Sequence, residues 1–468
     1  MQSKDSSASD PHSAKGLPPV TPPSGKFIAQ LFLVPLAIVG AIALVFFAIL
    51  WLFGDVLGGL GGPRRPAQFL DKLDKSNPDV RWRGAADLAQ VLLRDNQLAS
   101  DPRFALDLAE RLRKAMDATA AGEKALAERL AKQPRLAERL SKLVQGEPDL
   151  ERAPDDAEWK ALKAQWTALE PDLNYTLYLS ACLGNFALPV GAPLLIELAG
   201  REPAEDNILV TMQRRRAVWA LANLGDNLRR FDRLSPERQA EVLDRLEREA
   251  AVSGDRGRWA RAALDFLTAR QAGRPQTMGV DEVLVRCAED PQDPFLRELA
   301  AFAMGFWEGT PDENRRMEQA LFRLTQDDGR GSELLAHLWV NRENIAADSQ
   351  PVTSRPGVRV QYNANLALAR RGSDRVRLDM LEEMLDEEGQ KAVHRLRRSD
   401  GREDPDEATA YLTVVGALKG LTELHAKNPT KVAERPSLRE AIDRLAQSRN
   451  AIVRTEAEQT RIALSPSP

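Results

Sequence analysis

The side chains that could do chemistry in this chain are few and widely spaced. It has only two cysteines, Cys182 and Cys287, and four histidines, His12, His337, His394 and His425. No Cys-x-x-Cys pair occurs, no histidine is followed by Glu, and neither a phosphate-binding loop nor a nucleophile elbow is present. We therefore expect no enzyme activity, no metal site and no cofactor.

The two cysteines fit a structural role better than a chemical one. Cys182 occupies a position of a helical motif where other copies carry Ala, and Cys287 shares a helix face with Val283 and Leu284. A free cysteine in such a place packs as a small apolar side chain. We expect both to be buried and unreactive.

The most concentrated positive run is Arg214, Arg215 and Arg216. One interpretation is that these side chains pair with nearby carboxylates or are solvated. The other is an anionic docking patch at the start of a helix, for an acidic peptide or a lipid head group. The sequence leaves both open.

Composition limits the function classes. The chain has 468 residues, and its 65 basic and 69 acidic side chains give a net charge of −4, which disfavours nonspecific nucleic-acid binding. An apolar content of 43% excludes a wholly disordered chain, and two cysteines exclude a disulfide framework.

The first 66 residues differ from the rest. Residues 1–26 are rich in Ser and Pro and predict a disordered tail. Residues 27–53 predict a transmembrane helix, because Leu31 to Phe53 contains no charge and a helix of that length would span about 34 Å. Residues 54–66, rich in Gly and Pro, predict a linker. We expect a single-pass membrane protein, with the flanking charges placing the large domain in the cytoplasm.

From residue 67 onward a helical period dominates, and one pattern recurs. After Arg297 come Ala300, Ala301 and Ala303, and after Arg214 come Ala217, Val218 and Ala220. Small residues at this spacing clear a strip on one helix face, so that a neighbouring helix can approach closely.

Related patterns begin at positions 81, 176, 214, 259, 297, 361, 411 and 454, with most gaps near the period of two-helix repeats. On these motifs, and on Asp293-Pro294 before Leu296-Arg297, residues 67–468 resemble the HEAT-repeat family. The resemblance implies an all-α fold, an α-solenoid of helix pairs, and a role in scaffolding and protein binding. The first helices of pairs are expected at 192–198, 280–287 and 377–385.

Three stretches interrupt the repeats. A helical insertion is expected around 97–170, including an amphipathic helix pair at 122–146 with Pro134 between its halves. Residues 347–358, with two prolines, predict a loop, and the charge-dense residues 386–407 predict a solvated extension or loop.

These observations favour a membrane-anchored scaffold or adaptor that binds other proteins through the surface of the solenoid. The alternative is a structural, homo-oligomeric component of an envelope or secretion assembly, so self-association stays open. The partner is not specified by any motif.

Overall fold

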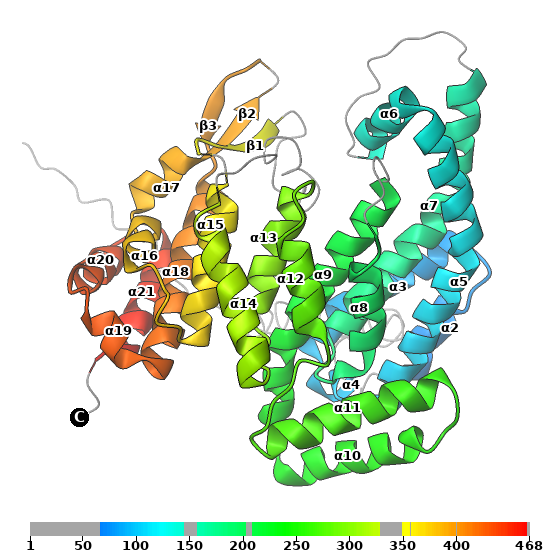
Figure 1. Cartoon of the computed structure of the whole chain (residues 1–468), viewed down its shortest axis with the longest axis horizontal. Coiled ribbons are helices and arrows are strands. Elements are labelled where there is room, and N and C mark those ends of the chain that lie inside the picture. The colour runs from blue at the N-terminus through cyan, green and yellow to red at the C-terminus, as the bar shows by residue number, and fades with distance from the viewer. Residues whose placement is uncertain are drawn as a thin grey trace, which may run out of the picture. The chain divides into compact units, whose positions relative to one another are not determined.

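Helices make up most of the chain in the computed structural model (Figure 1), which confirms the predicted all-α class in its coarse form. The structure describes residues 66–144, 157–202, 208–327, 349–355, 357–398 and 400–465. Residues 65–468 form one compact unit. The predicted tail, transmembrane helix and nearly all of the predicted linker lie outside the described residues, as do His12 and His337.

Within the described ranges, seven helices follow one another side by side, each packed against the next. We call them the second helices, because each is the later member of a helix pair. They are α3 (Pro78–Arg94), α7 (Ala157–Gly184), α9 (Ile208–Asp232), α13 (Pro294–Met304), α15 (Val358–Arg371), α18 (Glu407–Lys427) and α21 (Ala451–Ala463).

Each second helix packs against an earlier partner, its first helix. The first helices are α2 (Pro66–Leu73), α5 (Pro102–Lys132), α8 (Ala192–Ala199), α12 (Val280–Ala288), α14 (Pro311–Leu324), α16 (Leu378–Met384) with α17 (Glu387–Val393), and α20 (Ser437–Leu445). The first helices expected near 192, 280 and 377 are thus α8, α12 and α16. Short elements connect the pairs: α4 (Asn96–Ala99), the 3₁₀ turn η1 (Pro189–Gly191) and α19 (Pro429–Ala433).

Many helices begin at a cap followed by proline. The side chains of Asn77, Asp101, Ser235, Thr310 and Asn428 each accept a hydrogen bond from a backbone N–H of the first turn, and each precedes a proline. The cap satisfies an otherwise unpaired donor, and proline has no N–H to leave unpaired at this position. These dipeptides set where the helices start.

Close approach between second helices depends on small residues, as the motif predicted. A Cβ atom at Gly184 of α7 would lie 2.6 Å from the carbonyl oxygen of Ala220 in α9. A Cβ atom at Gly305, which ends α13, would lie 3.1 Å from the Cα of Ala367 in α15. Ala220 and Ala301 are fully buried. The small-residue strips therefore face the neighbouring helices.

The motif at Trp259 behaves differently from the others. Its helix, α11 (Asp255–Gln271), pairs with α10 (Pro236–Ala250) in a hairpin (Figure 1). This hairpin packs on α5 and η1. The second helix α9 instead contacts α13 directly, and the Trp307 Nε1–H donates to the carbonyl oxygen of Leu221 at 2.9 Å. The hairpin is therefore an insertion between two pairs, because α11 packs on α10 and α5 while α9 packs directly on α13.

The predicted insertion around 97–170 spans most of α4, all of α5, α6 (Pro134–Val144) and the first half of α7. The first half of α5 belongs to the main core of the unit, whereas the end of α5, α6, the first part of α7 and the start of α9 share a separate hydrophobic core, which we call the distal core. The distal core comprises Leu126, Leu130, Leu136, Ala137, Leu140, Trp159, Leu162, Trp166, Leu173, Ile208 and Leu209.

A buried polar layer lies between the two cores. Thr119 and Gln213 donate to Glu123 Oε1 at 2.7 and 2.9 Å, and Arg201 donates to Glu123 Oε2 at 2.9 Å. Pro171 lies within α7, two residues before Leu173 of the distal core and four before Tyr175 of the main core. Because proline removes a helical hydrogen bond, α7 is locally weakened where the two cores meet.

Two predicted loops are partly strands, which corrects the sequence reading. β1 (Ser349–Thr353), β2 (His394–Arg398) and β3 (Glu403–Pro405) form an antiparallel sheet in the order β1-β2-β3. Thr353 is opposite His394, and Arg397 is opposite Glu403. Several of the charges that indicated a solvated loop lie on β2 and β3 and pair across the two strands, as between Arg397 and Glu403 at 2.9 Å.

The predicted localisation is also corrected. Among the helices of the described residues, none is long and apolar enough to cross a bilayer. The longest, α5 and α7, bury apolar side chains on the core side but carry charged residues elsewhere on their surface. This finding stands against a single-pass membrane protein with a cytoplasmic domain. The apolar segment from Leu31 to Phe53 itself lies outside the described residues.

Candidate interaction surface

The predicted docking patch is mostly inside the protein. Arg214 is 3% exposed, and its Nη1 donates to Asp290 Oδ2 at 2.7 Å. Arg215 is fully buried and binds Asp293 with two nitrogens, Nε to Oδ2 at 2.8 Å and Nη2 to Oδ1 at 2.7 Å. Neither guanidinium is available to an external anion, so the docking interpretation is wrong for these two residues.

Arg216 turns the other way from its two neighbours. It is half-buried, and its guanidinium lies over the ring of Tyr178, 5.4 Å from the centroid. Burial lowers its pKa to about 10. Of the predicted patch, only Arg216 lies near the surface, and its position is set by an aromatic ring.

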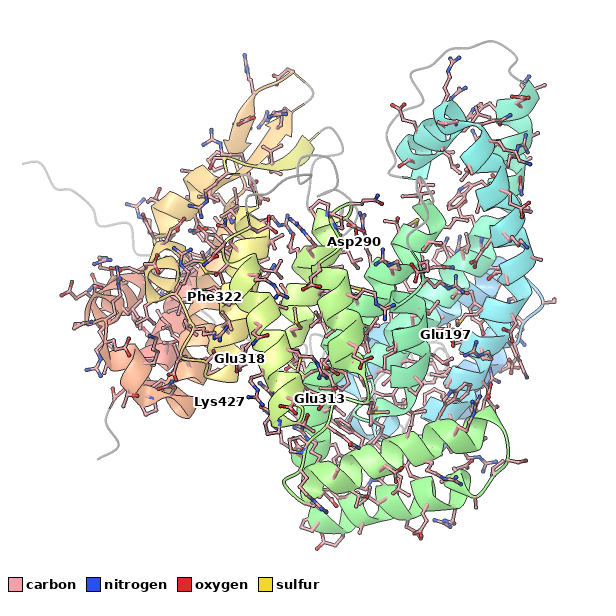
Figure 2. All side chains as sticks on the ribbon, in the orientation of Figure 1. Glu197, Asp290, Glu313, Glu318, Phe322 and Lys427 are labelled. Carbon is pink, nitrogen blue, oxygen red and sulfur yellow. The ribbon has the colours of Figure 1, made fainter. Side chains whose placement is uncertain are left out.

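The acidic partners explain why the patch is buried. Asp290, labelled in Figure 2, lies in the turn between α12 and α13, 76 residues from Arg214 in sequence. Asp293 lies in the same turn, 78 residues from Arg215. The same relationship joins Arg81 of α3 to Asp172 of α7 and Arg297 of α13 to Asp327 after α14, both at 2.6 Å. An arginine near the start of one second helix thus holds an acidic residue of the next pair. The arginines at motif positions 81, 214 and 297 are structural.

A second group of side chains lies on or next to the second helices, and of its members only Arg216 was singled out from the sequence. Trp82 of α3 stacks on Tyr178 of α7 with ring centroids 5.7 Å apart, and Arg216 of α9 covers Tyr178. Trp219 of α9 stacks on Phe302 of α13 at 5.6 Å. We call the full set the aromatic–arginine row: Trp82, Tyr178, Arg216, Trp219, Phe302, Phe306 and Arg370.

The row is accessible from outside. Trp219 is 37% exposed, whereas Trp82, Tyr178, Phe302 and Phe306 are half-buried. Phe302 and Phe306 meet edge to face at 5.0 Å, and the Arg370 guanidinium lies 5.1 and 4.7 Å from their ring centroids. Stacking and cation–π contacts hold these rings in fixed positions.

Spacing could have pointed to this row. Arg216 and Trp219 are three residues apart and share one face of α9, and Phe306 follows Phe302 by four residues, just beyond the end of α13. In α13 the face that carries Phe302 excludes the small residues Ala300, Ala301 and Ala303, which are fully buried. Aromatic residues on a face that the neighbouring helices do not cover are the signal that sequence reasoning passed over.

The remaining candidate groups offer little chemistry. Cys182 and Cys287 are free and buried. Burial raises the pKa of the Cys182 thiol, and it also raises the pKa of the Cys287 thiol, to about 11. The pKa of His394, on β2, falls to about 4, chiefly because it is buried. In the part of the chain that the structure describes, no group of three His, Cys, Asp or Glu residues could hold a metal ion.

Comparisons with known proteins add no assignment. No protein-family model matches the chain, and no curated protein does. Among solved structures, human deoxyhypusine hydroxylase in complex with glycerol is 13% identical, with 74% of this chain and 98% of that chain covered and a TM-score of 0.21. An engineered protein is 15% identical, with 86% and 99% covered and a TM-score of 0.20. Scores this low carry no argument about fold or function.

Proposed function

We propose that this chain is a scaffold or adaptor that binds other proteins through the second-helix face of a HEAT-like α-solenoid. The observation that carries the proposal is the aromatic–arginine row, which runs over five consecutive second helices, from Trp82 on α3 to Arg370 on α15. Trp, Tyr and Arg are the residues most enriched where protein interfaces concentrate their binding energy.

The rigidity of the row supports the same role. Trp219 is held flat against Phe302, with an angle of 13° between the ring planes. A ring that is already fixed loses less side-chain entropy when a partner covers it. A stack of helix pairs also offers an extended surface on which several side chains can contact one partner.

The test compares two exposed apolar side chains in chemical crosslinking and affinity capture from native extracts. Trp219→Ser removes the most exposed ring of the row, and Val252→Ser, in the turn between α10 and α11, is the matched control at 46% exposure. We expect a defined heterologous partner to be recovered by the wild type and the control and to be lost by Trp219→Ser, with melting temperatures shared by all three.

Two outcomes would count against the proposal. Equal recovery by all three proteins would remove the second-helix face as the binding surface. Dominant self-crosslinks, with no heterologous partner, would favour the homo-oligomeric structural component instead.

A further inference from the structure

Arg370 lies near the end of α15, and its guanidinium is buried. The residue is 8% exposed, and among the residues that the structure describes its side chain has neither a hydrogen-bond partner nor an ion-pair partner. Within these residues, its Nη1 in particular is fully buried and has no hydrogen-bond partner. Burial lowers its pKa, as expected for a cation removed from water without a full counter-charge. Such a group is costly unless something outside the described contacts satisfies it.

The adjacent Arg371 makes the polar contacts that Arg370 lacks, although its Nε is also buried without a hydrogen-bond partner among the described residues. It donates to the carbonyl oxygens of Met304 and Trp307 at 3.1 and 2.5 Å and to Asn314 Oδ1 at 2.6 Å. Arg371 therefore fixes the end of α13 to α15. The two side chains diverge, and packing of α13 on α15 does not require the guanidinium of Arg370 to form a polar contact.

Two aromatic rings lie against the guanidinium of Arg370. Phe302 and Phe306 hold the guanidinium at 5.1 and 4.7 Å from their ring centroids, and Trp219 extends the same surface by stacking on Phe302. Gly305 lets the side chain lie close to the backbone of α13, since a Cβ atom there would be 3.3 Å from Arg370 Cδ. The site thus combines the desolvated guanidinium of Arg370 with a partly exposed apolar surface. We call this surface, formed by Trp219, Phe302 and Phe306, the apolar shelf.

The charges around the site limit what it can bind. Glu423 of α18 is close enough to act on Arg370, but both its oxygens already accept from Arg229, at 3.2 and 3.1 Å. Asp226, 56% exposed, lies 4.0 Å from Arg229. These two carboxylates disfavour a polyanion such as a nucleic acid or a clustered phosphate, whereas a single carboxylate can approach Arg370.

We propose that Arg370, with the shelf of Trp219, Phe302 and Phe306, binds a peptide segment of a partner protein in which Asp or Glu stands next to an aromatic or large apolar side chain. The carboxylate pairs with the guanidinium, and the apolar side chain covers Trp219. This inference rests on the proposed function, because it names the chemistry of a partner that binds the second-helix face.

The test uses the full-length chain and a phage-displayed library of random peptides as the probe. Selected peptides are expected to share Asp or Glu beside an apolar residue, and to lose binding to Trp219→Ser. The most enriched peptide is then synthesised with its acidic residue intact and as the matching amide, Glu to Gln or Asp to Asn. Affinities of both forms are measured for the wild type, Arg370→Gln and Arg370→Lys.

We expect the amide peptide to bind the wild type about tenfold more weakly, because a carboxylate pairs with a guanidinium much more strongly than a neutral amide oxygen does. It should lose little affinity for Arg370→Gln, where the cation is already absent, and Arg370→Lys should bind the acidic peptide with intermediate affinity. Since each ratio compares two peptides on one protein, a change in the stability of the variant does not affect it.

The outcomes separate this inference from the proposed function. Peptides that need Trp219 but show no acidic preference, or an equal loss with the amide on the wild type and on Arg370→Gln, would overturn the carboxylate site and leave the scaffold role standing. Selected peptides that bind Trp219→Ser as well as the wild type would overturn both, as would a selection that yields no peptide.

Discussion

Asp293 has two structural roles, because its carboxylate caps α13 and also binds Arg215 of α9. Its Oδ1 accepts from the backbone N–H of Leu296 at 2.9 Å and from Arg215 Nη2 at 2.7 Å. The start of one second helix is thereby tied to the side of the preceding one. A run of arginines that resembles a surface patch in the sequence is part of the packing between helix pairs.

The first prediction follows from that pair. Arg215→Met should lower the free energy of unfolding by about 3–5 kcal/mol, because removing one partner leaves a buried carboxylate without its counter-charge. Urea titration followed by circular dichroism measures the change. The control is Arg248→Met, which removes an exposed ion pair with Asp244 and should have almost no effect. Equal midpoints for the two variants would show that Arg215 is not structural.

The second prediction concerns the approach of α7 to α9. Gly184→Ala should destabilise the protein, since its Cβ would lie 2.6 Å from the backbone oxygen of Ala220, which cannot move aside easily. Gly416→Ala in α18 is the matched control. Its Cβ would meet only the tip of Leu366 at 3.3 Å, and alanine favours the helix. Thermal melting should place Gly184→Ala clearly below the wild type and Gly416→Ala at or above it.

The third prediction is a pH dependence from His394. Its pKa is about 4 in the folded protein, against an ordinary value of 6.5, so the unfolded chain binds more protons between these values. The free energy of unfolding should therefore fall as the pH drops from 6.5 to 4, by up to about 1.4 kcal/mol per pH unit from this residue. Above pH 7 this contribution is constant.

Comparison with His394→Gln isolates that effect from other titrating groups. Denaturant unfolding of both proteins at several pH values should show a difference that is constant at pH 7 and above and shrinks below pH 6.5. The charged residues near the imidazole are Arg359 and Asp406, and its Nε2 lies 3.2 Å from Thr413 Oγ1. Parallel pH profiles for the two proteins would contradict the assignment.

The fourth prediction concerns the distal core. Because a polar layer around Glu123 separates it from the main core, Leu162→Ala should loosen α6 and the adjoining part of α7 without unfolding the rest. Hydrogen exchange should quicken in those segments and stay unchanged in α13 and α15. Leu221→Ala, in the main core, should instead quicken exchange across the unit. A uniform response to both variants would mean that the two cores unfold as one.

The sequence by itself determined the local properties of this protein. Helical periodicity, the cap-and-proline starts and the strips of small residues are encoded within a few residues of one another, and the structure has helices and close helix contacts at those places. The burial of Cys182 and Cys287 also followed from their positions on helix faces.

Only the tertiary structure decided what those helices meet. Arg215 binds Asp293, which is 78 residues away in the sequence, and Trp219 stacks on Phe302 of another helix. Neither contact therefore leaves a local pattern in the sequence. The same holds for the hairpin of α10 and α11, whose motif resembles the others but whose helices pack on α5. A charge or a ring has the same local sequence signal whether it becomes buried, paired or exposed, because its environment is supplied by residues distant in the chain.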